Sequence, residues 1–176
     1  PSEKERLRLA ETHDQLADAV EKFAAADYAG ALPLATRAAA VAGPLQDYAR
    51  LYLGLSQLRL GRIEDGRRTL DSLRETKAQG YLTVATALAS GEAAETAADF
   101  AAAVAIYDAL ASDRAAFDEE ILMRLGRAAL AAGDRPKAAA AYHRVYYELP
   151  LSDSASIAAE RLETLKEHVV RSGYKA

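Results

Sequence analysis

The stretch that decides the fold runs from Gly133 to Pro150 and reads GDRPKAAAAYHRVYYELP. Gly133 and Asp134 predict a tight turn, because glycine tolerates a positive φ and an aspartate can cap the helix that follows. Pro136 falls in the first turn of that helix, where its missing N–H has no helical partner to lose. Helical spacing then places three residues on one inward face: Ala138, Tyr142 and Val145. The stretch therefore indicates a turn followed by a helix that ends at Pro150.

The same pattern occurs four times along the chain. Its turn positions are Asp27, Arg62, Asp99 and Asp134, which lie 35, 37 and 35 residues apart. A small residue follows each turn and lets two helices approach closely; these residues are Ala31, Gly66, Ala103 and Ala138. The period is similar to the roughly 34 residues of the tetratricopeptide repeat, in which each repeat is a helix, a turn and a second helix.

This resemblance implies an all-α fold, a right-handed superhelix of stacked antiparallel helix pairs with about nine helices. We expect one domain over residues 1–176, with repeats at about 12–45, 47–80, 82–117 and 119–152. A capping helix at about 153–171 would cover the open end of the stack. The third repeat is the least regular, because Ser90-Gly91 replaces a large-small pair, and we expect irregular or loosened packing from Gly91 to Ala98.

Composition excludes several classes of function. The net charge is −4 and the two signs are interspersed, whereas a nucleic-acid site needs basic residues gathered on one face. The chain has no cysteine, which excludes disulfides and thiolate zinc sites. No apolar stretch approaches the roughly 20 residues of a membrane span. The polar start at Pro1 is no signal peptide, although an export signal removed from the mature chain stays possible.

We expect no catalytic, cofactor or metal site. The histidines are His13, His143 and His168, and no two of them have metal-ligand spacing. A Gly-rich loop that could cradle a phosphate is absent. The acidic run that begins at Asp118 could be read as paired carboxylates, but it lies at an expected helix start, where the backbone dipole favours acids. We therefore interpret it as a cap and the chain as no enzyme.

A tetratricopeptide groove follows the inner faces of the first helices of the repeats. Chaperone-tail binders carry Lys and Asn there, which clamp a carboxylate. In this chain the corresponding positions are mostly apolar and include Leu51, Leu55, Leu88, Met123 and Arg127. The pattern argues against a carboxylate clamp and favours either a partner helix or extended apolar segment in the groove, or self-packing of a tightly curved superhelix.

Three tyrosines near the end of the fourth repeat are candidates for a patch that stacks on a sugar or a peptide. Tyr142 has the spacing of a core residue. Tyr146 and Tyr147 are adjacent, so they cannot share one helical face, and we expect one of them to be exposed or to pack on the final helix. The sequence therefore predicts a possible aromatic contact at Tyr146 or Tyr147.

The run from Ala138 to Ala155 contains Tyr-Tyr-Glu-Leu-Pro-Leu-Ser and resembles the end of the helical region of bacterial soluble lytic murein transglycosylases. In that family a Tyr-Tyr-Glu-x-Pro-x-Ser segment closes a repeat, and a separate lysozyme-like domain holds the catalytic Glu. The resemblance implies a non-catalytic, periplasmic scaffold that positions such a domain on peptidoglycan. Outer-membrane assembly and cell-division coordinator proteins carry a similar segment at the end of a repeat. The alternative is therefore a stand-alone adaptor, periplasmic or cytoplasmic.

Overall fold

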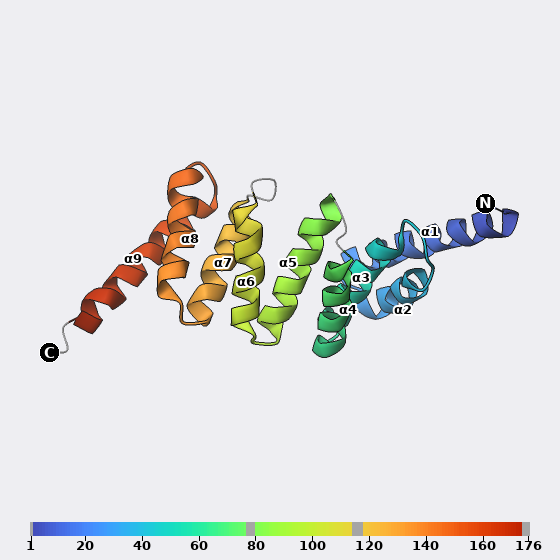
Figure 1. Ribbon diagram of the computed structural model, residues 1–176, viewed down its shortest axis with the longest axis horizontal. Coiled ribbons are helices and arrows are strands. Elements are labelled where there is room, and N and C mark those ends of the chain that lie inside the picture. Colours follow the sequence, from blue (N-terminus) through green and yellow to red (C-terminus); the bar gives the residue numbers. More distant parts are fainter. Residues whose placement is uncertain (1, 77–79, 114–117, 174–176) are drawn as a thin grey trace. The chain divides into compact units, whose positions relative to one another are not determined.

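The computed structural model describes residues 2–76, 80–113 and 118–173, with side chains as far as Lys166. Within these ranges it consists of α-helices and has no strand (Figure 1), which confirms the all-α prediction. The nine helices in this part of the chain are α1 (Glu3–Ala24), α2 (Tyr28–Ala39), α3 (Gln46–Arg59), α4 (Ile63–Glu75), α5 (Tyr81–Thr96), α6 (Phe100–Ser112), α7 (Glu119–Ala131), α8 (Arg135–Glu148) and α9 (Ser154–Gly173).

The helices form two compact units, Pro1–Ala97 and Ala98–Ala176. The boundary lies inside the predicted repeat 82–117, so that α5 belongs to the first unit and α6 to the second. Within each unit, helices that follow one another along the chain pack together. Short connections between long helices favour this arrangement of antiparallel neighbours.

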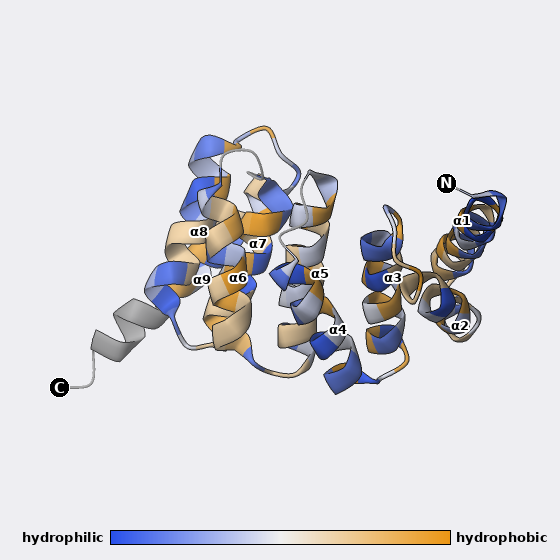
Figure 2. Cartoon of the chain, turned by 45° about the vertical axis from the view of Figure 1, so that its right-hand side comes forward, coloured by the Kyte–Doolittle hydropathy of each residue, from blue (hydrophilic) through white to orange (hydrophobic). Residues whose placement is uncertain are grey.

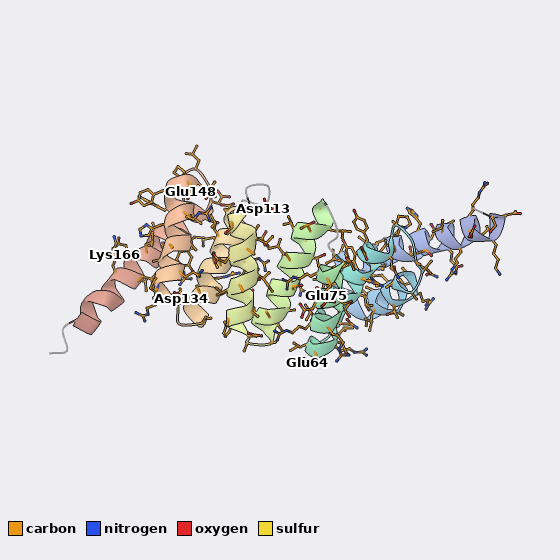
Figure 3. All side chains as sticks on the ribbon, in the orientation of Figure 1. Glu64, Glu75, Asp113, Asp134, Glu148 and Lys166 are labelled. Carbon is orange, nitrogen blue, oxygen red and sulfur yellow. The ribbon has the colours of Figure 1, made fainter. Side chains whose placement is uncertain are left out.

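The turns between paired helices share one local structure. The residue before each turn position has a positive φ, and these residues are Ala26, Gly61, Ala98 and Gly133. Asp134 then caps α8, because its side chain accepts a hydrogen bond of 3.0 Å from the backbone N–H of Lys137 (Figure 3). Asp27 and Asp99 cap α2 and α6 in the same way. The Gly-Asp turn predicted at residues 133–134 is thus confirmed, and the same geometry forms at two sites where alanine replaces the glycine.

The core of the first unit forms where α3 meets α4 and α5. Its buried members are Leu51, Leu58, Leu70, Leu73, Leu82, Ala89 and Ala93. Gly54 allows the close approach, because a Cβ at this position would lie 2.6 Å from the Leu70 side chain. The beginning of α1 takes no part in this packing, because residues 2–11 are exposed. Figure 2 shows that the helix is hydrophilic where it starts.

The core of the second unit places Tyr142 of α8 against Gly126 of α7. The ring is fully buried, and a Cβ at Gly126 would lie 2.5 Å from it. Val145 is buried on the same face of α8, and Leu122 and Leu125 are buried on α7. The inward-facing positions predicted from the fourth repeat are therefore confirmed.

Helix α5 is regular over its whole length. It continues without a break through Ser90 and Gly91 and ends at Thr96. The backbone of this stretch is therefore regular, because Ala and Glu are strong helix formers and support the helix even where large core residues are few. The expectation of irregular or loosened packing at residues 91–98 stays a prediction.

Helix α9 covers one side of α8 at the predicted position of the final helix. Its buried residues are Ala155, Ala158, Leu162 and Leu165. The opposite face carries exposed polar residues, among them Ser156, Glu160 and Glu163. A helix that is apolar on one face and polar on the other suits the end of a helical stack.

Candidate binding surface

The predicted inner-face leucines of the first unit are largely packed inside it. Leu51 is 4% exposed and belongs to the core cluster with Leu58 and Leu70, so its assignment to a partner groove was wrong. The reason is that α4 and α5 pack against this face of α3. Leu55 is half-buried against the same core, and Leu88 is half-buried on α5.

In the second unit the predicted groove residues are more accessible. Met123 is half-buried and Arg127 is exposed, and both lie on one face of α7 because they are four residues apart. Among the described side chains, no carboxylate forms an ion pair with Arg127. This face of α7 is therefore partly exposed.

Two exposed tyrosines and a histidine form a row on the last turns of α8. The Tyr147 ring is stacked on His143, with 5.7 Å between centroids and 13° between planes. Tyr146 meets Tyr147 edge-on, with 5.0 Å between centroids. Tyr147 is 70% exposed and Tyr146 is 43% exposed, so both tyrosines are accessible where the sequence led us to expect one. We call His143, Tyr146 and Tyr147 the aromatic row.

A cavity of about 450 Å³ lies between α8 and α9, and we call it the α8–α9 groove. Its lining residues are Arg135, Pro136, Ala139, His143, Leu162, Leu165 and Lys166. Ala139, His143 and Tyr147 follow at intervals of four residues along α8, so the groove and the aromatic row adjoin at His143. Together they form one accessible surface with an apolar floor.

The rim of the α8–α9 groove is basic. Arg135 is exposed and pairs with no carboxylate among the described residues. Lys166, which Figure 3 labels on α9, lies 3.0 Å from Glu163, but both side chains are about two-thirds exposed. An ion pair that solvent screens so strongly is weak, so Lys166 remains able to exchange partners.

The sequence did not indicate the α8–α9 groove. Leu162 and Leu165 were visible as apolar residues of the final helix, and a row of i, i+4 residues on α8 was visible as well. The space between them depends on how closely α9 approaches α8, which residue spacing does not determine. The signal that the sequence did contain was the apolar i, i+3 pair Leu162 and Leu165, which faces the small residue Ala139.

The acidic run before α7 has the structural role that the sequence suggested. Asp118 caps α7 by accepting a hydrogen bond of 3.0 Å from the backbone N–H of Glu120. Glu119 accepts a bond of 3.4 Å from the backbone N–H of Ser154 and so joins the start of α7 to the start of α9. Among the described residues, no three His, Asp or Glu side chains are grouped to hold a metal ion.

Comparison with known proteins agrees with this architecture. The tetratricopeptide repeat model matches residues 48–76, over α3 and α4, and residues 120–152, over α7 and α8. A crystal structure of a tetratricopeptide repeat protein from Parabacteroides merdae ATCC 43184 superposes with a TM-score of 0.75 and 14% sequence identity. The fold is of the tetratricopeptide type. The similarity covers 90% of this chain and 61% of the length of that chain.

None of the curated proteins compared with the chain matches it in sequence. In the part of the chain that the structure describes, no helix combines the length and apolarity needed to cross a membrane. Tetratricopeptide repeats imply a protein-interaction or scaffold domain, and the fold is typically non-catalytic.

Proposed function

We propose that the chain is a non-catalytic scaffold that binds a protein partner through the α8–α9 groove and the aromatic row. The partner segment is a helix or an extended apolar peptide. The observation that supports this most strongly is the pair of exposed tyrosines beside an apolar cavity. Tyrosine is a frequent hot-spot residue at protein interfaces, because it offers a large contact area with few rotatable bonds.

The segment Tyr146–Ser152 supports a more specific proposal. Its Tyr-Tyr-Glu-Leu-Pro-Leu-Ser sequence is similar to the segment that ends the helical region in lytic transglycosylases. On this proposal the chain is the periplasmic scaffold of a cell-wall enzyme, and a separate lysozyme-like domain contacts peptidoglycan. The gene tests it: a lysozyme-like domain encoded after Ala176 would support the proposal, and a stop codon directly after Ala176 would refute it.

The alternative is a stand-alone adaptor, periplasmic or cytoplasmic, of the outer-membrane assembly or cell-division coordinator type. The α8–α9 groove favours it, because the groove lies entirely within this chain and its floor is apolar. An apolar floor suits leucine or phenylalanine side chains of a partner helix better than the hydroxyl groups of a glycan.

Selection of peptides tests the binding function in both cases. The complete chain is immobilised and used to select from a phage library of random linear peptides. Peptides rich in apolar residues should be enriched and should bind in solution. Tyr147→Ala and Tyr146→Ala should each weaken that binding about tenfold, which corresponds to about 1.4 kcal/mol.

The first unit supplies matched controls. Tyr81 is 72% exposed and Tyr48 is 38% exposed, close to the values for Tyr147 and Tyr146. Tyr81→Ala and Tyr48→Ala should leave peptide binding unchanged. The proposal fails if no peptide is enriched, or if the control substitutions weaken binding as much as those in the aromatic row.

A further inference from the structure

The α8–α9 groove has two chemically different ends. Arg135 is the first residue of α8, and Lys166 lies in the later part of α9. Because α9 folds back along α8 after a short turn, the start of α8 lies beside the later part of α9, and both cations line the same cavity. Figure 3 shows α8 between its labels Asp134 and Glu148, with Lys166 on α9. We call Arg135 and Lys166 the basic end of the groove; the aromatic row adjoins the other end.

Every titratable side chain that lines the groove is basic. These residues are Arg135, His143 and Lys166, and no Asp or Glu among the described residues is part of the lining. Two carboxylates lie close by but outside it. Asp134 is engaged in capping α8, and Glu163 lies 3.0 Å from Lys166 in a pair that is largely exposed to solvent. An exposed pair is weak, so a carboxylate of another molecule can compete for the cation.

The distance between the two ends limits what can occupy the groove. Arg135 and Tyr147 are twelve residues apart on one helix, which at a rise of about 1.5 Å per residue corresponds to about 18 Å. The floor between them is apolar and contains Ala139, Leu162 and Leu165. About three turns of a partner helix, or five to six residues of an extended chain, cover this length.

The preceding repeat contains an ion pair at the equivalent position. Asp108 lies nine residues after the turn position Asp99, and His143 lies nine residues after the turn position Asp134. The Asp108 carboxylate accepts a hydrogen bond of 2.6 Å from the Lys137 ammonium group of α8. In the last repeat a basic residue thus replaces the acid. The side chain that complements this position is therefore an acceptor such as a carboxylate, and not a second cation.

We propose that the partner segment carries an aspartate or glutamate at one end of its apolar stretch, and that Arg135 and Lys166 bind this side chain. This inference rests on the proposed function and adds the charge and the direction of the segment. Both cations donate hydrogen bonds to a carboxylate. Because both are exposed, they act on orientation and association rate more than on affinity. The acid lies at the basic end, and the apolar residues extend over the floor toward the aromatic row.

The phage library tests this when it is selected in parallel on the wild type and on the double variant Arg135→Gln, Lys166→Gln. The wild-type pool should carry Asp or Glu at one end of the apolar stretch, and the variant pool should keep the apolar residues and lose the acid. The control is Lys4→Gln, Arg37→Gln, which removes the same charge from exposed positions of the first unit and should leave the acid enriched.

A synthetic peptide from the wild-type pool, amidated at its C-terminus, then isolates the side-chain contact. Replacing its acid by the neutral amide should weaken binding to the wild type about fivefold, chiefly through slower association, and should have no effect on the double variant. High salt should reduce the difference between the two peptides, because it screens exposed charges.

A charge exchange gives the reverse test. The variant Arg135→Glu, Lys166→Glu should bind the peptide with Lys in place of its acid several-fold more tightly than the wild type does. Circular dichroism checks that the variant is folded. We expect it to be, because both positions are exposed and a glutamate in the first turn of α8 is favoured by the helix dipole.

Three results would overturn the inference. A wild-type pool with apolar enrichment but no acid would refute it and leave the proposed function standing, whereas a pool with no enriched peptide would refute both. Equal acid enrichment on the double variant would place the contact elsewhere. Displacement of the peptide by single-stranded DNA at concentrations where polyglutamate has no effect would assign the basic end to a nucleic acid.

Discussion

At Tyr142 the chain buries a hydroxyl group that a phenylalanine would not have. Packing alone would favour phenylalanine, since the ring fills the space over Gly126 and the oxygen finds no partner among the described residues. At Tyr107 the same oxygen is bonded to Arg124. The two sites therefore differ in whether the buried hydroxyl has a partner among the described residues.

This difference predicts opposite effects of one substitution. Tyr142→Phe should raise the free energy of unfolding by about 1 kcal/mol, because it removes an unpaired buried polar atom. Tyr107→Phe should lower it by a similar amount, because it breaks a hydrogen bond to a charged group. Urea unfolding followed by circular dichroism measures both. Destabilisation by Tyr142→Phe would show that its hydroxyl is already satisfied in the free protein.

Alkaline pH gives a second test of the same residue. Burial raises the pKa of Tyr142 above its ordinary value near 10. Between the unfolded and folded pKa values the folded state holds the proton and the unfolded state releases it, so stability falls as pH rises above about 10. The wild type should lose more stability than Tyr142→Phe in this range. If the stability difference between the wild type and Tyr142→Phe is the same at pH 8 and pH 11, the result contradicts the burial of this hydroxyl.

At the scale of single helices, the turn residues were the most predictable feature of the chain. Asp27, Asp99 and Asp134 were recognised from their repeat spacing, and each caps a helix as expected. Arg62 occupies the equivalent position before α4 and makes no side-chain cap. The repeat pattern thus located all four turns. Whether a side chain caps the following helix depends on the residue type at the turn position.

Helix capping provides a paired prediction. Asp134→Ala should lower the free energy of unfolding by about 1 kcal/mol, because the backbone N–H of Lys137 loses its acceptor. Arg62→Asp should raise it by a similar amount, because the new carboxylate can cap α4. Asp18→Ala on the exposed face of α1 is the control and should change little. Thermal melting measures all three, and stabilisation by Asp134→Ala would refute the cap.

The candidate surface was only partly predictable at this scale. Helical spacing predicted that one of Tyr146 and Tyr147 is exposed or packs on the final helix, whereas both are exposed. Leu51 was misplaced, because the spacing that marks an inner face also fits a residue that neighbouring helices cover.

At the scale of the whole molecule, repeat spacing was enough to predict the fold class but not its division into units. The periods of 35 and 37 residues indicate helix pairs, and the family match and the superposition agree. The boundary between Ala97 and Ala98 has no signal in composition, because the flanking helices are both rich in alanine. A division of this kind depends on contacts between distant residues, which a local pattern does not record.

The two units predict a local response to damage. Gly126→Ala places a methyl group within 2.5 Å of the Tyr142 ring and should lower the free energy of unfolding by about 1 to 3 kcal/mol. Native-state hydrogen exchange should become faster in α7 and α8, while amides of α3 and α4 keep their rates. Equal acceleration throughout the chain would show that the two units open together.

The central claim is that the partner binds the second unit through α8 and α9. An amide NMR titration of the complete chain with a selected peptide tests it most directly. The account predicts that the largest chemical-shift changes occur within residues 135–166 and include Tyr147 and Leu162, while α1 to α4 stay unchanged. Changes concentrated in residues 3–76 would contradict it.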